Sequence, residues 1–179
     1  QEDRAYIESQ KYLSTSNLEE NRQYFIDQLA ELESNIDLSF LQEDRSIRLS
    51  SVRELLDRAE KSLEVNHADY DRLLGFSQEN GLSINAVLQY AWHKVLSVYG
   101  NTSTTVVGTT ISGRNLPIDD IEESVGLYIN TLPLIIEHKS ELSIIEQIRE
   151  VQARVTELNE RSNVDLAKLQ ENGERLFDS

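Results

Sequence analysis

The chain of 179 residues contains no cysteine and no methionine, and only two prolines. Without thiols it has no disulfide, no cysteine nucleophile and no thiolate metal site, and such a composition suits a reducing compartment. We therefore expect a cytoplasmic protein. Because position 1 is Gln1 and not a methionine, we also expect that this segment was excised from a longer polypeptide.

Basic residues and long apolar runs are scarce as well. The 17 basic residues against 32 acidic ones give a net charge of -15, which repels nucleic-acid phosphates and anionic membrane surfaces. No apolar run approaches the ~20 residues that cross a bilayer. Residues 1–15 lack the basic start and apolar centre of a signal peptide. The composition therefore argues against nucleic acid and membrane as partners.

Histidine, the residue most often used for acid–base catalysis at neutral pH, occurs only at His67, His93 and His138. No serine or aspartate at a recognisable offset completes a nucleophile pattern around any of them. We therefore predict no catalytic residue in this chain. His93 is expected to face solvent or the edge of the core, and the other two histidines are expected to be exposed.

Metal-ligand patterns are equally weak. No pair of histidines or carboxylates combines close spacing with a third ligand of matching type. The acidic cluster at residues 119–123 could hold a hard cation, but it lacks the glycine and the ordered oxygen spacing of a calcium loop. A solvated loop is the preferred interpretation, and no metal site is predicted.

Amphipathic helices are predicted where apolar residues recur at spacings of three and four. Capping residues support them: Ser83 and a Ser143–Glu146 capping box mark two starts, Gly81 marks one end, and Gly100-Asn101 marks another. The four predicted helices cover residues 17–32, 67–80, 84–99 and 142–161.

Strands are predicted at residues 104–112 and 125–137, which are rich in β-branched residues and lack helical spacing. The nearly continuous apolar character of the second segment indicates a strand covered on both faces. Residues 59–65 are favoured as a further strand, although 50–65 also suits a helix. Loops are expected at residues 35–51 and 113–123. The resulting fold class is α/β, a two-layer sandwich with a mixed sheet packed against helices.

Polar residues interrupt the apolar pattern at the end of the first strand and the start of the second, in residues 111–114 and 125–131. Asn130 and Thr131 need hydrogen-bond partners or a cavity to face. Gly126 permits a bulge or a close approach of the backbone. From residue types alone, a role at a cavity is no better supported than a structural one, with Asn130 bonded to nearby backbone and Arg114 in solvent.

Residues 125–131, Val-Gly-Leu-Tyr-Ile-Asn-Thr, resemble the late core motif of nonribosomal peptide synthetase condensation domains, approximately Ile/Val-Gly-x-Phe-Val-Asn-Thr. Residues 82–92 and 106–114 are similar to that family in order and spacing. Two weaker matches flank them. Residues 4–7 resemble the end of the motif that opens the C-terminal lobe, and residues 163–169 fall where a later polar-aromatic motif is expected but depart from it.

The resemblance implies half of a two-lobed fold related to chloramphenicol acetyltransferase. We expect residues 1–179 to form the C-terminal, acceptor-side lobe, without the N-terminal catalytic lobe and its HHxxxDG motif, and with the last C-terminal strands truncated. The implied reaction joins a donor acyl or peptidyl group to an acceptor aminoacyl group, both held on phosphopantetheine arms of carrier proteins. No cofactor is expected on this lobe itself, and the isolated chain is expected to be inactive.

The resemblance also implies which residues line the substrate tunnel or the lobe interface. Arg114, positioned by Ser112 and Gly113, would pair with the aspartate of the missing motif, and Gly126 would let the backbone bend toward the tunnel. The full set of candidates is Ser112, Gly113, Arg114, Gly126, Tyr128, Asn130 and Thr131.

The implied partners are the N-terminal lobe, a peptidyl carrier protein and a neighbouring adenylation domain, in a pathway that makes an antibiotic or siderophore. A chain that lacks its partner lobe is also expected to expose an apolar face. Two alternatives stay open: the matching lobe of an epimerisation or heterocyclisation domain, and a non-catalytic protein-interaction module.

Overall fold

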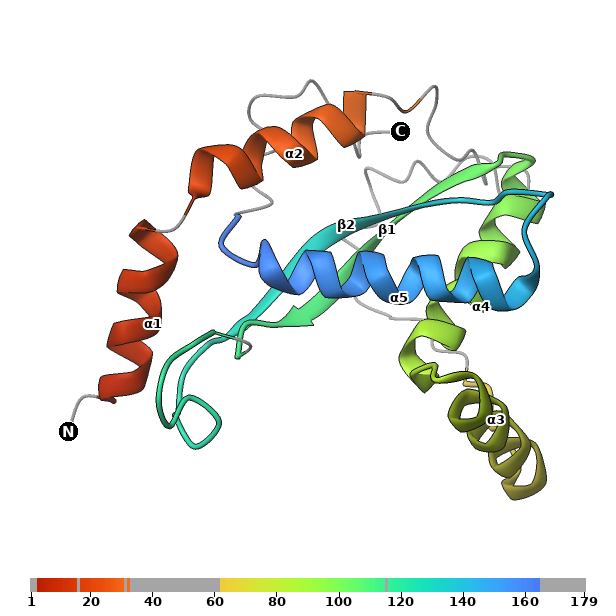
Figure 1. Ribbon diagram of the computed structural model, residues 1–179, viewed down its shortest axis with the longest axis horizontal. Helices are drawn as coiled ribbons and strands as arrows, with labels where there is room; N and C mark the ends of the chain where they lie inside the picture. The colour runs from red at the N-terminus through yellow and green to blue at the C-terminus, as the bar shows by residue number, and fades with distance from the viewer. Residues whose placement is uncertain (1–2, 16, 31, 33–61, 115, 165–179) are drawn as a thin grey trace, which may run out of the picture.

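The computed structural model describes residues 3–15, 17–30, 32, 62–114 and 116–164. In these residues two antiparallel strands form a hairpin whose connecting loop, residues 113–128, lies beside the first helix (Figure 1). The last helix runs along the hairpin. The elements in chain order are α1 (Arg4–Thr15), α2 (Leu18–Ala30), α3 (His67–Asn80), α4 (Ile84–Gly100), β1 (Thr104–Ser112), β2 (Ile129–Glu137) and α5 (Ile144–Glu160).

The capping signals in the sequence mark the helix ends correctly. The Ser83 side chain accepts a hydrogen bond at the start of α4, and Ser143 and Glu146 form both bonds of a capping box at the start of α5. Gly81 ends α3 in the left-handed conformation with φ of 66°. At the end of α4 that conformation falls on Asn101, with φ of 47°, while Gly100 stays helical.

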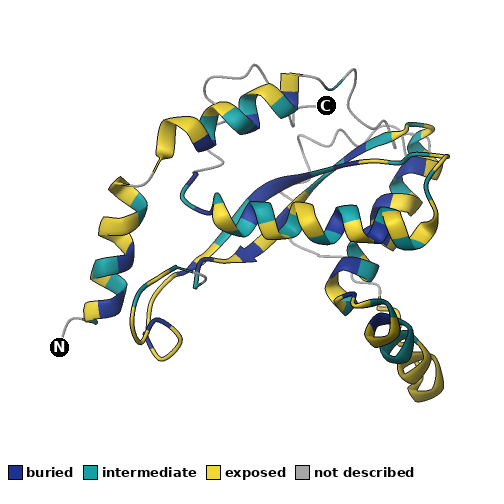
Figure 2. Ribbon diagram, viewed as in Figure 1, coloured by how far each residue is buried: buried dark blue, intermediate teal, exposed yellow. Residues whose placement is uncertain are grey.

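The core lies where α4 and α5 cover the hairpin. Figure 2 shows the buried residues gathered along the strands and on the helix faces turned toward them. Leu132, Pro133 and Leu134 are all buried, which confirms that the centre of β2 is covered on both faces. The apolar core consists of Phe25, Leu82, Ala86, Tyr90, Ile111, Leu132, Leu134, Ile136, Ile148, Val151, Leu158 and Val164.

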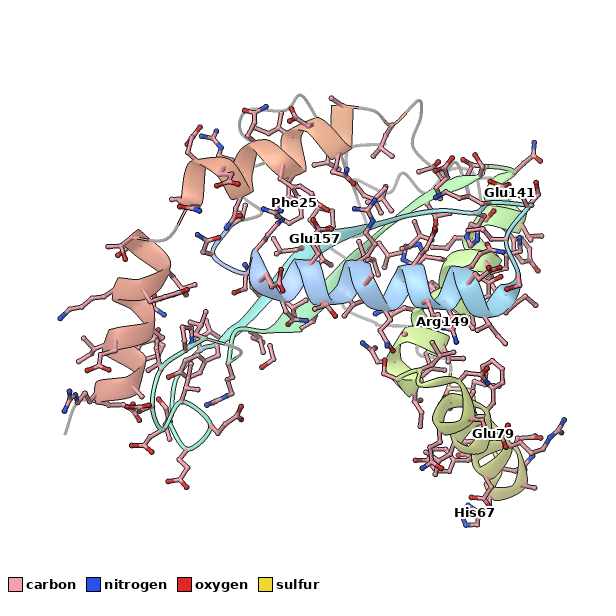
Figure 3. All side chains as sticks on the ribbon, viewed as in Figure 1. Phe25, His67, Glu79, Glu141, Arg149 and Glu157 are labelled. Carbon is pink, nitrogen blue, oxygen red and sulfur yellow. The ribbon has the colours of Figure 1, made fainter. Side chains whose placement is uncertain are left out.

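Helix α2 is attached to α5 by one large apolar side chain and a polar network. Phe25 is 1% exposed and lies with Glu157 between the two helices (Figure 3). The Tyr24 hydroxyl donates to Glu157 Oε2 at 2.7 Å, and the Arg161 guanidinium lies 4.1 Å from the centre of the Tyr24 ring. Burial, followed by the bond to Glu157, raises the pKa of Tyr24. The network therefore fixes α2 against the C-terminal half of α5.

The strand predictions need two corrections. The second strand begins at Ile129, not at residue 125, because residues 125–128 leave the hairpin and contact α1 instead. Residues 62–65 carry no strand, while 59–61 and the predicted loop at 35–51 lie outside the described residues. Within the described part of the chain the sheet has two antiparallel strands, which is consistent with an α/β fold.

Helix α1 was not predicted from the sequence. Only Ala5 and Ser9 are buried along its 12 residues, so few of its side chains belong to a core. Its start is fixed by Asp3, whose carboxylate accepts a hydrogen bond from the Tyr6 backbone N–H at 3.1 Å. Its contacts with the hairpin come from Asp3 and Tyr6 and reach residues 124–128, which lie far away in the sequence, so the local sequence does not reveal them.

The apolar stripe that predicts α4 is not the face that this helix buries. Leu88, Trp92, Val95 and Tyr99 are between 46% and 53% exposed. The buried face consists of Ala86, Tyr90, His93 and Ser97. Helix α4 thus carries an exposed apolar stripe, a feature that marks interaction surfaces.

Candidate functional site at the end of the hairpin

The strand register brings the two polar segments of the sequence together. Ser112 lies opposite Ile129, and Thr110 lies opposite Thr131. One residue further, the Gly113 N–H donates to the Tyr128 carbonyl at 3.0 Å. Residues 111–114 and 128–131 therefore meet at one end of the hairpin, where the loop 113–128 approaches α1 (Figure 1).

Gly113 is required by this close contact. A Cβ at this position would collide with the Tyr128 carbonyl oxygen, which is itself fixed by the hydrogen bond from Gly113. Any side chain would push the two backbones apart. Glycine at position 113 therefore allows the backbones of residues 113 and 128 to lie in contact where the loop begins and ends.

Arg114 follows directly and is held in three places. Its backbone N–H lies 3.4 Å from Ser112 Oγ, and its Nη1 donates to the Ile121 carbonyl. Its guanidinium carbon lies 4.2 Å from the centre of the Tyr128 ring, a cation–π contact. The Ile121 bond uses one of the five N–H donors of the guanidinium. Arg114 is therefore fixed in orientation and not free in solvent.

Tyr128 is anchored at both its ring and its hydroxyl. The residue is 8% exposed, and its ring meets the Tyr6 ring edge-on at 5.5 Å. Its hydroxyl lies 2.5 Å from Ser124 Oγ, and Ser124 in turn donates to Asp3 Oδ1 at 2.6 Å. The motif residue thus connects the hairpin to α1 through Ser124.

Asp3 closes this network with its second oxygen, which accepts the Val125 backbone N–H at 2.9 Å. The Ser124 hydroxyl, then the backbone N–H groups of Val125 and Tyr6, lower the pKa of Asp3 to about 2. The carboxylate is therefore ionised at every pH where the protein would function.

Gly126 lies against Tyr6 of α1. A Cβ on Gly126 would collide with the Tyr6 ring. The close approach of the backbone expected from the sequence is present, and it is an approach to α1. A bend toward a tunnel stays a prediction.

The Asn130 side chain connects β2 to the residues that follow α5 through hydrogen bonds. Its Nδ2 donates to the carbonyls of Ser162 at 2.9 Å and Val164 at 2.7 Å, while its Oδ1 accepts from the Thr131 N–H at 2.8 Å. Because neighbouring residues of a strand point to opposite faces, Thr131 points away from the Asn130 side chain. Roles of the two residues in lining a tunnel stay predictions.

Two open clefts flank the site. One, of about 380 Å³, lies between the start of α1 and the loop; its lining is mainly acidic and includes Asp3, Glu8, Asp119, Asp120 and Glu123. The other, of about 430 Å³, is lined by polar side chains that include Asn17, Asn21, Ser162 and Asn163. Among the described residues, no group of three His, Cys, Asp or Glu is arranged to hold a metal ion.

The predicted exposure is confirmed for one of the three histidines and wrong for the other two. His67 is exposed at the start of α3, as predicted (Figure 3). His93 is fully buried, and its Nδ1 lies 2.6 Å from Thr105 Oγ1, so its predicted place in solvent or at the core edge is wrong. The reason is that β1 presents a buried threonine to α4.

His138 is also more buried than predicted. It is half-buried, and its ring lies 5.8 Å from the Tyr90 ring. Within the described residues, neither of its ring nitrogens has a hydrogen-bond partner. Burial lowers the pKa of His138; burial, followed by the charge of His138, lowers the pKa of His93 to about 4. Both histidines are therefore neutral at pH 7.

Asp3, Tyr6 and Ser124 are the site residues that sequence reasoning missed. The only signal was the weak similarity of residues 4–7 to a family motif, which gave no reason to connect them with residues 124–128. More than 110 residues separate the two segments, since Asp3 and Ser124 are 121 positions apart. Only the folded chain places them in contact.

Comparison with known proteins identifies the class of domain. The family model described as Condensation domain matches residues 2–178. The chain is 35% identical over 184 residues to N-(5-amino-5-carboxypentanoyl)-L-cysteinyl-D-valine synthase of Amycolatopsis lactamdurans, covering 99% of this chain and 5% of that protein. It is 31% identical over 169 residues to bacitracin synthase 1 of Bacillus licheniformis, covering 94% of this chain and 3% of that protein.

Solved structures agree on the fold. The first condensation domain of the calcium-dependent antibiotic synthetase superposes with a TM-score of 0.71 at 16% identity, over 94% of this chain and 35% of that chain. The chain belongs to the condensation-domain family, as its residues 125–131 suggest. It spans only a small part of the curated relatives it matches. In the described residues, no helix is both long and apolar enough to cross a membrane.

Proposed function

We propose that this chain is the C-terminal, acceptor-side lobe of a condensation domain that forms amide bonds in nonribosomal peptide synthesis. The observation that carries the proposal is the family match over residues 2–178 together with the meeting of residues 111–114 and 128–131 at one end of the hairpin. Condensation domains of such synthetases work with carrier and adenylation domains. We extend this to a peptidyl carrier protein and a neighbouring adenylation domain as partners.

The exposed side of the motif supports a lobe interface at this end of the hairpin. Val125, Leu127 and Ile129 are 81%, 73% and 64% exposed, while Tyr128 between them is buried. These three exposed apolar side chains lie within three residues of Tyr128, whose ring contacts Arg114, and exposed apolar patches mark interaction sites. An N-terminal lobe bearing HHxxxDG would cover this end of the hairpin and bring its aspartate to the Arg114 guanidinium, where a charge-assisted pair can form.

In this arrangement the chain forms one wall of the substrate tunnel and does not supply the catalytic acid or base. None of its histidines is suited to that role: His93 is buried away from the site, His138 packs on Tyr90, and His67 lies at the start of α3. The catalytic histidine would come from the partner lobe. The substrates would be thioesters on phosphopantetheine arms, the amine of the acceptor attacking the donor carbonyl, with the thiol of the donor arm leaving.

Reconstitution tests the proposal. The chain is mixed or co-expressed with its N-terminal lobe, then given one carrier protein loaded with a donor acyl group and one loaded with an aminoacyl group, and the condensed product is measured by mass spectrometry. We expect product from the two lobes together and none from either lobe alone. Product from this chain alone, or none from the two-lobed domain with several loaded pairs, would contradict the proposal.

The acceptor-side assignment has a separate test. Binding of each carrier protein to the isotopically labelled chain is followed through backbone amide signals. We expect the aminoacyl-loaded acceptor carrier to shift signals of this chain at lower concentration than the donor carrier does. The reverse preference would assign this lobe to the donor side while leaving the condensation function in place.

A further inference from the structure

The orientation of Arg114 depends on the Tyr128 ring, and residues distant in the sequence hold this ring in place. The guanidinium rests on the Tyr128 ring, 4.2 Å from its centre, and Nη1 is bonded to the Ile121 carbonyl. The Ile121 bond alone leaves the plane of the guanidinium free to rotate about that contact. The ring removes this freedom, because a cation–π contact favours the guanidinium over the ring face.

The ring is fixed at its far end by a directed chain of hydrogen bonds. Because the ionised Asp3 can only accept, Ser124 must use its single proton toward Asp3 Oδ1 at 2.6 Å. Tyr128 must therefore be the donor in the 2.5 Å contact with Ser124. The Asp3 carboxylate therefore fixes the direction of both hydrogen bonds: Tyr128 donates to Ser124, and Ser124 donates to Asp3. Arg114 lies against the ring of this same tyrosine.

Burial makes this chain of bonds effective. Ser124 is 6% exposed and Tyr128 is 8% exposed, so water has little access to the bond between their two hydroxyls. Asp3 is half-buried and lines the acidic cleft. Tyr6 packs edge-on against the Tyr128 ring from α1. The family motif has Phe at the position of Tyr128, and the hydroxyl here adds an attachment that a phenylalanine could not make.

We propose that Asp3, Ser124 and Tyr128 are positioning residues for Arg114, holding its remaining N–H donors in a fixed direction for an acceptor group of the partner lobe. This inference rests on the proposed function for its role in catalysis, but the holding of Arg114 is a property of this chain. Asp3 lies at the start of α1, so the first helix takes part in placing a side chain that follows β1. A shift of about 1 Å in such a group can lower a rate a hundredfold.

The first experiment measures the position of Arg114 in this chain by NMR. The Tyr128 ring current displaces the Arg114 side-chain signals, so these signals report the stacking directly. We expect Tyr128→Phe, Ser124→Ala and Asp3→Asn each to move them toward the values of an exposed arginine, while the amide signals of α5 stay in place. Tyr128→Phe keeps the ring and its packing, so a change in this variant reports the loss of the hydroxyl bond, and the unchanged α5 signals show that the chain is folded.

Asp119→Asn is the matched control. Asp119 lines the same acidic cleft as Asp3, so its substitution removes a similar charge close by. We expect no change in the Arg114 signals. Unchanged signals in the first three variants, or equal shifts in all four, would overturn the inference.

The second experiment uses the two-lobed domain with loaded carrier proteins. We expect Tyr128→Phe to lower kcat roughly tenfold, with KM for the carriers unchanged. An unchanged kcat would overturn the positioning role. A wild-type domain that makes no product would contradict the proposed function instead, and the NMR result would still decide whether Arg114 is held as inferred.

Discussion

Tyr6 occupies the space that a side chain on Gly126 would need. This contact joins α1 to the motif at residues 125–131, and it is reinforced by the edge-on packing of Tyr6 on Tyr128 at 5.5 Å. Because the backbone of residue 126 lies against an aromatic ring, glycine at this position sets where α1 can lie. The motif therefore organises the N-terminal helix as well as the end of the hairpin.

Gly126→Ala should destabilise the chain by about 1–3 kcal/mol, since the new methyl group forces the Tyr6 ring out of its place. Urea unfolding measures the change. In the double variant Tyr6→Ala with Gly126→Ala, the collision is absent, so the two costs should not add. Additive costs would mean that Tyr6 and Gly126 are not in contact.

Gly113→Ala should cost more than Gly126→Ala, above about 2 kcal/mol, because its methyl group would meet backbone and not a movable ring. The Tyr128 carbonyl cannot move without breaking its bond with the Gly113 N–H. Gly75→Ala is the control: nothing lies within 4 Å of its added Cβ, and it is inside α3. It should stabilise the chain by up to about 1 kcal/mol. Equal effects of the Gly113 and Gly75 changes would refute the steric explanation.

Asn130→Asp should destabilise the chain by about 2–4 kcal/mol at pH 7 although the side chain keeps its shape. The substitution replaces a donor with an acceptor opposite the carbonyls of Ser162 and Val164. Hydrogen exchange should show earlier opening of residues 162–164 than in the wild-type chain. Asn85→Asp, at an exposed position in the first turn of α4, makes the same chemical change without these partners and should not destabilise the chain, because a carboxylate is favourable at a helix N-terminus.

Local signals in the sequence predict most of the described secondary structure. The Ser143–Glu146 capping box and the β-branched run of β1 each depend on residues a few positions apart, and both were found where expected. The fold class followed from them. The two polar segments of the hairpin could also be proposed from sequence, because strand pairing brings an outgoing and a returning segment together.

Contacts between distant segments were not predictable in the same way. Nothing in the residue types of Asp3 and Ser124 indicates a bond across 121 positions. The apolar stripe of α4 did not predict the buried face for a related reason. Apolar spacing indicates an amphipathic helix, but it does not show whether another segment of this chain covers the apolar face. The prediction for His93 was wrong for the same reason, because its burial depends on Thr105 across the helix–sheet interface.

The burial of His93 predicts a loss of stability in acid. Its pKa is about 4 in the folded chain because burial, and then the charge of His138, oppose protonation. In the unfolded chain the ordinary value is 6.5. Below pH 6.5 the unfolded state therefore binds a proton that the folded state does not, so the free energy of unfolding falls as the pH falls toward 4. The full loss from this residue is about 3 kcal/mol.

Urea unfolding of His93→Phe at pH 7, 6 and 5 isolates this effect. The variant loses the bond to Thr105 and should be less stable at pH 7, but its stability should fall less steeply between pH 7 and 5. His138, whose own pKa is lowered by burial and also by the charge of Lys94, remains in the variant and accounts for part of the slope that persists. His67→Gln, which removes a histidine from an exposed position at the start of α3, is the matched control. If His93→Phe and wild type lost stability in parallel over this range, His93 would have to be accessible to protons in the folded chain, and its burial between α4 and β1 would be refuted.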